Sequence, residues 1–356
     1  VGVGGAGTPL VMLHGYANAA MYFYRNLLGL AAATDAPVYA LDMLGWGLSS
    51  RPSFKPEDKS VEACEDVFVE SLEAWRAAAG IEKMNLAGHS MGGYLSVAYA
   101  ERYPQRVERL VLLSPVGVPE GEGVKERLSG ASWRFRTMVG MMGFFFERGL
   151  TPSSVVRNLP EKRGLGMVRN YVENRLPAVA SLDEREFLTE YLYRNAVLPG
   201  SGEYCLNRLL TITVDARKPA VHRIPSLNVR SVAFLYGEVD WMDASGGLLV
   251  QQRAEQRRKG GLEAPEVEVY GIRNAGHLLM LENYQEFNAA VAKALGCEHR
   301  LPEGAARPKA IHFSDEVQFF RRTVFRERDG KVERANSGKA PSADADADAV
   351  AATVGA

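Results

Sequence analysis

A serine stands between two glycines in the segment NLAGHSMGGY, which runs from Asn85 to Tyr94. The short apolar run Met84–Ala87 before it predicts a buried strand, and the residues after it suit a helix. A strand–serine–helix turn is sharp, so Gly88 and Gly92 fit crowded positions where a Cβ has no room. The hydroxyl of Ser90 would then stand above a sheet as a nucleophile. Taken alone, the pattern also fits a structural or phosphate-binding glycine turn.

A serine nucleophile needs a general base, and the chain has six histidines. His277 follows the predicted strand Glu266–Tyr270 and the turn Asn274–Gly276, which would present its imidazole at the carboxyl edge of the sheet. We therefore predict His277 as the base. The others lie in glycine motifs, at the end of a helical stretch or near the C-terminus: His14, His89, His222, His299 and His312.

The base in turn needs a carboxylate that fixes its tautomer and stabilises the imidazolium. Asp240 and Asp243 both follow the predicted strand Ser231–Tyr236; we favour Asp240 and keep Asp243 as the alternative acid. Glu238 is expected to point to solvent. The order Ser90, Asp240, His277 is that of α/β-hydrolases and differs from the orders in chymotrypsin and subtilisin.

An acyl-transfer site also needs two N–H donors for the oxyanion. The Met91 amide, at the start of the helix after Ser90, is predicted to be one of them. The turn His14-Gly15 follows a predicted strand and would aim the amide of Tyr16 or Ala17 at the serine; we favour Tyr16. The His14 side chain itself is expected to be a buried structural histidine.

Alternating strands and helices predict the scaffold that gathers these residues. Further strands are expected at Leu10–Leu13, Pro37–Leu41 and Leu110–Leu113, and a helix should begin after the N-cap Ser60 and end near Gly80. We expect an α/β fold with a mostly parallel sheet. Its predicted parts are a first core segment, a helical lid, a second core segment and a largely disordered tail: residues 1–118, 119–225, 226–297 and 298–356.

Composition excludes several other classes of protein. The net charge is −1, so no global basic excess favours nucleic-acid binding. The three cysteines are widely spaced and form no metal-type pair, which fits a reducing compartment. No apolar run reaches the roughly 18–20 residues of a membrane span. We expect neither a metal nor a cofactor.

Several segments together resemble α/β-hydrolases of the α/β-hydrolase-domain 4/5 type. The generic ones are GHSMGGY and NAGHLLMLEN; the more diagnostic ones are LGWGLSSRP, DWMD and the lid segment TPSSVVRNLP. The resemblance covers about Pro9 to Leu295, and it implies that strands which usually precede Leu10 are missing. That group is noted for His-x4-Asp, a proposed acyltransferase signature, but here Glu282 replaces the aspartate after His277.

The resemblance implies a serine esterase that acts on phospholipid, lysophospholipid or another acylglycerol ester, and that transfers the acyl group either to water or to lysophosphatidic acid. Some members of the group lack the serine and act as lipase coactivators, so a non-catalytic lipid-surface protein is one alternative. A soluble small-ester hydrolase is the other. We expect a cytoplasmic protein that needs no nucleic acid and whose family allows peripheral binding to membranes or lipid droplets.

The predicted lid contains an apolar stretch flanked by arginines, WRFRTMVGMMGFFFERG, from Trp133 to Gly149. It is too short to cross a bilayer, so it either packs on the core or enters a lipid surface. Farther along the lid, an arginine could pair with a phosphate head group. The candidates are Arg157, Arg163 and Arg169.

Overall fold

The structure is a computed structural model. It describes residues 2–3, 5–54, 60–121, 133–176, 179, 181–242, 244–306, 308–311, 325–328 and 331–334. Within these residues no helix is both long and apolar enough to cross a membrane.

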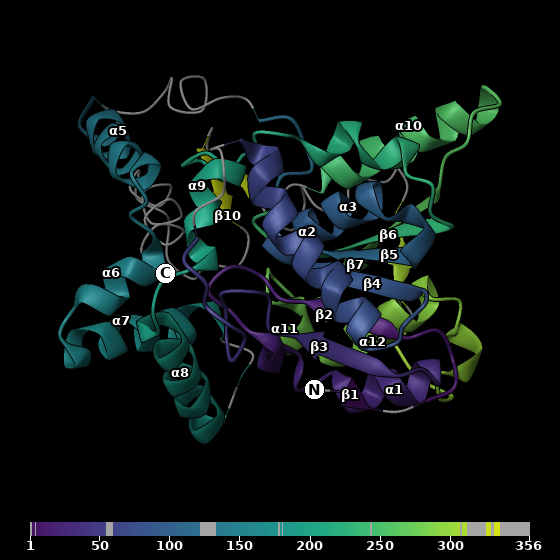
Figure 1. The fold of residues 1–356 in the computed structure, drawn as a ribbon, viewed down its shortest axis with the longest axis horizontal. Coiled ribbons are helices and arrows are strands. Elements are labelled where there is room, and N and C mark those ends of the chain that lie inside the picture. The colour runs from purple at the N-terminus through teal and green to yellow at the C-terminus, as the bar shows by residue number, and fades with distance from the viewer. Residues whose placement is uncertain are drawn as a thin grey trace.

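A twisted sheet of eight strands forms the centre of the described part of the molecule (Figure 1). Its order is β1-β3-β2-β4-β5-β6-β7-β8; the six strands from β3 to β7 are parallel, and the short strands β1 and β8 pair antiparallel at the two edges. The strands are β1 (Gly2–Val3), β2 (Leu10–Leu13), β3 (Val38–Leu41), β4 (Met84–His89), β5 (Val107–Leu113), β6 (Ser231–Gly237), β7 (Glu266–Ile272) and β8 (Lys309–Ala310). Parallel strands end at one edge, so the residues after β4, β6 and β7 are neighbours.

Helices cover both faces of the sheet because successive strand residues point to opposite sides. In β2, Val11 packs into the apolar cluster under one set of helices, whereas Met12 packs into the cluster under the other. The first set is α2 (Val61–Ala78), α3 (Met91–Arg102) and α10 (Ser245–Lys259); the second is α1 (Leu27–Thr34), α11 (Leu279–Glu282) and α12 (Tyr284–Ala294). This arrangement leaves the carboxyl edge of the sheet to loops.

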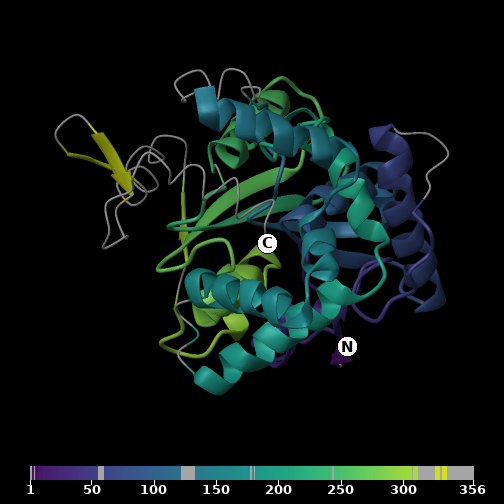
Figure 2. The same ribbon diagram turned by 90° about the vertical axis from the view of Figure 1, so that its left-hand side faces the viewer.

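Among the described residues, five α-helices lie between β5 and β6 in the sequence, in the segment predicted to be a lid, and they face the viewer in Figure 2. They are α5 (Trp133–Glu147), α6 (Pro152–Asn158), α7 (Glu161–Arg175), α8 (Leu182–Val197) and α9 (Leu206–Leu209). The α8 helix meets the loop after β2, where Arg25 forms an ion pair of 2.6 Å with Glu184. The lid therefore contacts the edge of the core that carries the loops after the strands.

Most predicted elements occur at their predicted positions. All six predicted strands are present, and the Ser60 side chain caps α2 by accepting the Ala63 amide. No strand was predicted before Leu10, so β1 is an addition to the sequence-based picture. In the segment expected to be largely disordered, the structure has β8 and two further paired strands, β9 (Phe325–Arg328) and β10 (Lys331–Arg334).

Candidate active site

Ser90 occupies a strained turn between β4 and α3. Its φ of 52° and ψ of −116° lie in a region that residues with a Cβ rarely adopt. The turn is held in place by backbone hydrogen bonds, because the Ser90 amide donates to Leu113 and the Ser90 carbonyl accepts from Gly93. This conformation is that of a nucleophile elbow.

Close backbone packing explains the glycines around Ser90. A Cβ on Gly88 would lie 2.3 Å from the Gly92 carbonyl oxygen, and one on Gly92 would lie 2.5 Å from the His14 carbonyl oxygen. A Cβ on Gly15 would lie 3.0 Å from the Ser90 Cβ, which places the loop after β2 directly against the serine. Gly88 is therefore required within the turn, and Gly92 and Gly15 are required where the turn meets the loop after β2.

Asp240 and His277 form a hydrogen-bonded pair. His277 Nδ1 lies 3.2 Å from Asp240 Oδ1, and the Asp240 side chain is almost fully buried while His277 stays partly exposed. A carboxylate only accepts hydrogen bonds, so this contact assigns the imidazole proton to Nδ1 and leaves Nε2 free to accept one. Asp243, the alternative acid, lies outside the described residues.

The surroundings of Asp240 favour its ionised form. Burial opposes ionisation, but His277, the Met242 amide and the Ser114 hydroxyl outweigh it, so the pKa of Asp240 lies below its ordinary value. Asp240 Oδ2 and Ser114 Oγ are both buried, and neither makes a hydrogen bond of acceptable geometry in the described structure. Ser114 therefore lowers the pKa of Asp240 less than His277 and the Met242 amide do.

The residue next to Ser90 links the serine turn to the histidine loop. His89 Nε2 lies 2.9 Å from the His277 carbonyl oxygen, and the two imidazole rings are 4.8 Å apart. Burial lowers the pKa of His89 to about 3, so the ring is neutral near pH 7 and donates this hydrogen bond. The structure thus brings Ser90, Asp240 and His277 to one edge of the sheet.

His14 and His222 have other surroundings. His14 is buried, accepts the Met43 amide at Nε2 and contacts the Gly15 carbonyl through Nδ1. Burial lowers its pKa to about 4. His222 is exposed and pairs with Glu120. The His14 ring therefore has a structural place beneath the loop that follows β2.

The two predicted oxyanion donors belong to the two segments that meet at the serine, the start of α3 and the loop after β2. Met91 is the first residue of α3, and the first amides of a helix have no partner within it. Tyr16 follows Gly15 and precedes Ala17, which has a positive φ of 58°. The Tyr16 ring packs edge-on against Trp46 at 5.1 Å. The Tyr16 side chain thus packs against Trp46, which connects the loop after β2 to the loop after β3.

Two carboxylates support the histidine loop in a way that the sequence did not reveal. Glu282 accepts the amides on both sides of His277, from Gly276 at 2.8 Å and from Leu278 at 3.1 Å. Glu238, predicted to face solvent, instead accepts the Asn274 amide at 2.8 Å. The His-x4-Glu spacing was visible in the sequence, but the backbone target of Glu282 depends on the fold of the turn.

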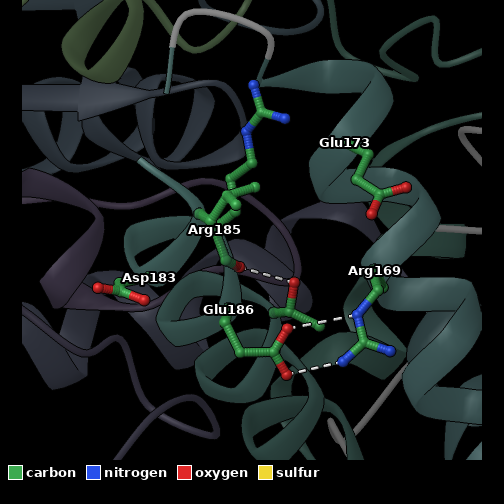
Figure 3. Close-up of a pocket in the computed structure, with 7 residues that line it drawn as sticks. Arg169, Glu173, Asp183, Arg185 and Glu186 are labelled. Carbon is green, nitrogen blue, oxygen red and sulfur yellow. Dashed lines mark hydrogen bonds and ion pairs between the residues drawn. The ribbon is translucent and has the colours of Figure 1, made fainter. Parts of the chain in front are cut away.

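The lid arginines proposed for a head group are partly engaged. Arg157 pairs with the buried Glu203 at 2.7 Å, and Arg169 makes a two-pronged contact with Glu186, whereas Arg163 is exposed. Arg169 and Glu186 line a pocket of about 280 Å³ between α7 and α8 (Figure 3). Its lining mixes both signs of charge and includes none of Ser90, Asp240 and His277. In the described residues no cluster of His, Cys, Asp and Glu could hold a metal ion.

Comparison with protein families gives a match to the α/β hydrolase fold over residues 8–284. The chain is 36% identical over 293 residues to a probable 1-acylglycerol-3-phosphate O-acyltransferase from Oryza sativa subsp. japonica, with 80% of this chain and 66% of that protein covered. It is 32% identical over 287 residues to the 1-acylglycerol-3-phosphate O-acyltransferase ABHD5 of Homo sapiens, with coverage of 80% and 76%. The chain thus spans slightly less than two thirds of the length of its rice relative.

Solved structures share the fold. A membrane phospholipase A described as a bacterial virulence factor matches with a TM-score of 0.56 at 22% identity, covering 84% of this chain and 82% of that one. A meta-cleavage product hydrolase from Pseudomonas fluorescens matches with a TM-score of 0.55 at 20% identity, covering 83% and 93%. The predicted fold and the resemblance to the α/β-hydrolase-domain 4/5 group are both confirmed. The chain belongs to the α/β hydrolase family.

Proposed function

We propose that this protein is a serine esterase that cleaves acyl esters of phospholipids, lysophospholipids or other acylglycerols. The observation that carries the proposal is the His277–Asp240 pair, whose loop is hydrogen-bonded to the residue preceding the strained Ser90. A nucleophile, a base and an orienting acid at one sheet edge are what acyl transfer requires. The names of the relatives, which refer to acylglycerol phosphate, support a lipid substrate.

The reaction proceeds in two halves. Ser90 Oγ bonds to the acyl carbonyl carbon while its proton moves to His277 Nε2, and the amides of Tyr16 and Met91 hold the oxyanion. When the ester C–O bond breaks, His277 gives that proton to the leaving glycerol oxygen, and the acyl group stays on Ser90. Water then attacks the acyl-enzyme, with His277 again as the base, and releases the fatty acid.

A second acceptor would make the same site an acyltransferase. If the hydroxyl of lysophosphatidic acid replaces water in the second half, the acyl group moves to that lipid with no other change in the machinery. The names of the relatives favour this candidate. The contacts of Glu282 do not add to it, because its carboxylate binds the backbone around His277 and not a substrate.

The surface of α5 supports action at a lipid surface. Trp133, Met141, Phe144 and Phe145 are all exposed on this helix, although large apolar side chains usually lie inside a protein. Arg134, Arg136 and Arg148 accompany them, and the single acidic residue, Glu147, pairs with Arg217. Apolar side chains flanked by arginines suit the surface of an anionic membrane or lipid droplet.

A serine-directed probe and a lipid panel test the function together. The purified chain is incubated with a fluorophosphonate, and separately with phospholipids and lysophospholipids, with and without acyl-CoA, and the products are followed by mass spectrometry. We expect labelling of Ser90 and release or transfer of fatty acid, both lost in Ser90→Ala. Labelling or lipid turnover that survives Ser90→Ala would contradict Ser90 as the nucleophile. An unaltered chain that neither takes the label nor turns over any of these lipids would contradict the esterase and favour the coactivator alternative.

A further inference from the structure

A lid residue, Asn195 in the last turn of α8, joins three parts of the molecule. Its side-chain oxygen accepts the Gly47 amide at 3.0 Å and Arg51 Nη2 at 3.2 Å. Its side-chain nitrogen donates to the carbonyl oxygens of Ala17 at 3.4 Å and Asn18 at 3.1 Å. A primary amide has two donors and two acceptor positions, so all four are used.

Asn195 is buried, so the loss of these hydrogen bonds would be costly. The residue is buried, with 8% of its surface exposed, and a buried amide that loses its partners leaves unpaired polar groups. Its orientation is also fixed by chemistry, because the carbonyl oxygens of Ala17 and Asn18 need donors while the Gly47 amide needs an acceptor. The side chain therefore fits this position in one orientation only.

The backbone that Asn195 holds is the one that carries a predicted oxyanion donor. Ala17, with its φ of 58°, follows Tyr16 directly, and such a conformation persists only where the surroundings impose it. The Asn18 amide also folds back to the Gly15 carbonyl at 3.4 Å, a long and therefore weak hydrogen bond. The contact of Asn195 with the Asn18 carbonyl, at 3.1 Å, is shorter than this local bond, whereas its contact with the Ala17 carbonyl is equally long. Farther along the loop, the Ala20 amide is held separately by Asp42 at 2.7 Å.

We propose that Asn195 is a positioning residue for the oxyanion loop, which couples the seating of lid helix α8 to the donor geometry at Ser90. A misplacement of about 1 Å of a group that stabilises the transition state costs roughly 10²-fold in rate. Asn195 acts through the backbone and touches no reacting atom. The inference deepens the proposed function and depends on it for its catalytic consequence, but the structural coupling stands apart from activity.

The test replaces the amide by an isosteric group with the wrong polarity. Asn195→Asp sets a carboxylate oxygen against the two carbonyl oxygens, and Asn195→Ala removes the contacts without adding charge. We expect both variants to lower kcat by about 10- to 100-fold with KM changed less than about threefold, because oxyanion donors act in the transition state. The matched control is Asn174→Asp, at an exposed lid asparagine that bonds only to Asn170 among the described contacts.

Hydrogen exchange separates this inference from the proposed function. In both Asn195 variants the peptide covering residues 14–20 should exchange faster than in the unaltered chain, while the exchange of β4 to β7 stays unchanged. This readout needs no turnover, so it also decides the coupling if the unaltered chain proves inactive. Unaltered exchange at 14–20 in Asn195→Ala, an unaltered kcat, or a rise in KM at constant kcat would each overturn the proposal.

Discussion

The loops at the sheet edge and the lid helix α5 are built under different constraints. The loop from Arg273 to Leu278 has its amides bound by Glu238, Glu282 and Glu286, and its histidine bound by Asp240. In α5, by contrast, Val139 and Phe146 are the buried members of its described side chains. The first region is fixed by many directional bonds, whereas the second is held by these two apolar side chains and by polar contacts at its C-terminal end, from Asn207 to the Phe146 carbonyl and from Arg217 to Glu147.

This difference in packing fits the two functions that we propose for these regions, catalysis at the sheet edge and lipid binding on α5. The proton-transfer site that we propose at the sheet edge would tolerate little error in position, which accounts for the many hydrogen bonds to the backbone around a single imidazole. A surface that meets lipid needs exposed apolar area and no fixed geometry. We therefore expect substitutions at the sheet edge to lower the rate of ester cleavage. Substitutions on α5 should instead weaken binding to lipid surfaces.

The largest effect is expected from Asp240→Asn. The amide nitrogen would donate toward His277 Nδ1 and favour the tautomer with its proton on Nε2, which cannot accept the serine proton. We expect kcat to fall by about 10⁴-fold, the loss typical when such an acid is neutralised. Initial rates on a micellar lysophospholipid measure it.

Asp243→Asn is the companion variant, since Asp243 was the alternative acid in the sequence. If Asp240 is the orienting acid, Asp243→Asn keeps the rate within about threefold of the unaltered chain, the range that a residue outside the reaction allows. If kcat fell more in Asp243→Asn than in Asp240→Asn, Asp243 would be the carboxylate that orients His277.

Glu282→Gln should produce an intermediate loss. Glutamine can still accept one of the two amides, from Gly276 or Leu278, but its NH₂ group faces the other. The histidine loop loosens, and kcat/KM is expected to fall by about 10- to 100-fold. Glu282→Asp keeps the charge and should recover part of the rate, which a general effect on folding would not produce.

The pH profile sharpens the Glu282 experiment. Burial, aided by repulsion from Asp240, raises the pKa of Glu282 although two amides and His277 oppose the shift. As pH falls, this carboxyl is therefore protonated at a higher pH than an ordinary glutamate, and the protonated form is the poorer acceptor. An acid-side loss of activity identical in the unaltered chain and in Glu282→Gln would show that Glu282 protonation contributes nothing to it.

The smallest effect on chemistry is expected on α5. The double variant Phe144→Ser, Phe145→Ser removes two half-exposed rings, and we expect about tenfold weaker binding to phosphatidylglycerol vesicles, which corresponds to about 1.4 kcal/mol. Turnover of a soluble short-chain ester should not change. Vesicle co-sedimentation and a p-nitrophenyl ester assay give the two readouts.

The control for α5 comes from α8. Leu182 and Phe187 are more exposed than the α5 rings, at 79% and 77%, but three acidic residues and only one arginine lie between them in the sequence: Asp183, Glu184, Arg185 and Glu186. Negative charge disfavours an anionic surface, so Leu182→Ser, Phe187→Ser should leave vesicle binding unchanged. Equal losses in both double variants would mean that exposed apolar area alone, and not the setting of α5, governs binding.

Much of the fold and of the site could be predicted from the sequence because these features have strict local signals. Buried parallel strands show as short apolar runs, and the elbow shows as glycines that its backbone contacts demand. The partners of Glu282, Glu238 and Asn195 could not be predicted, since each binds backbone whose position depends on the folded turn. Strand β1 could not be predicted because a strand of two residues is too short to show an alternation of apolar and polar side chains.

The three glycines packed around the serine limit how this scaffold can be altered. At positions 15, 88 and 92 even a methyl group would lie within 3.0 Å of neighbouring atoms, and at the last two those atoms include main-chain oxygens. A mutagenesis library aimed at new ester substrates should therefore keep these codons constant. Diversity is better introduced at Trp241, a partly exposed ring 5.0 Å from the imidazole of His277.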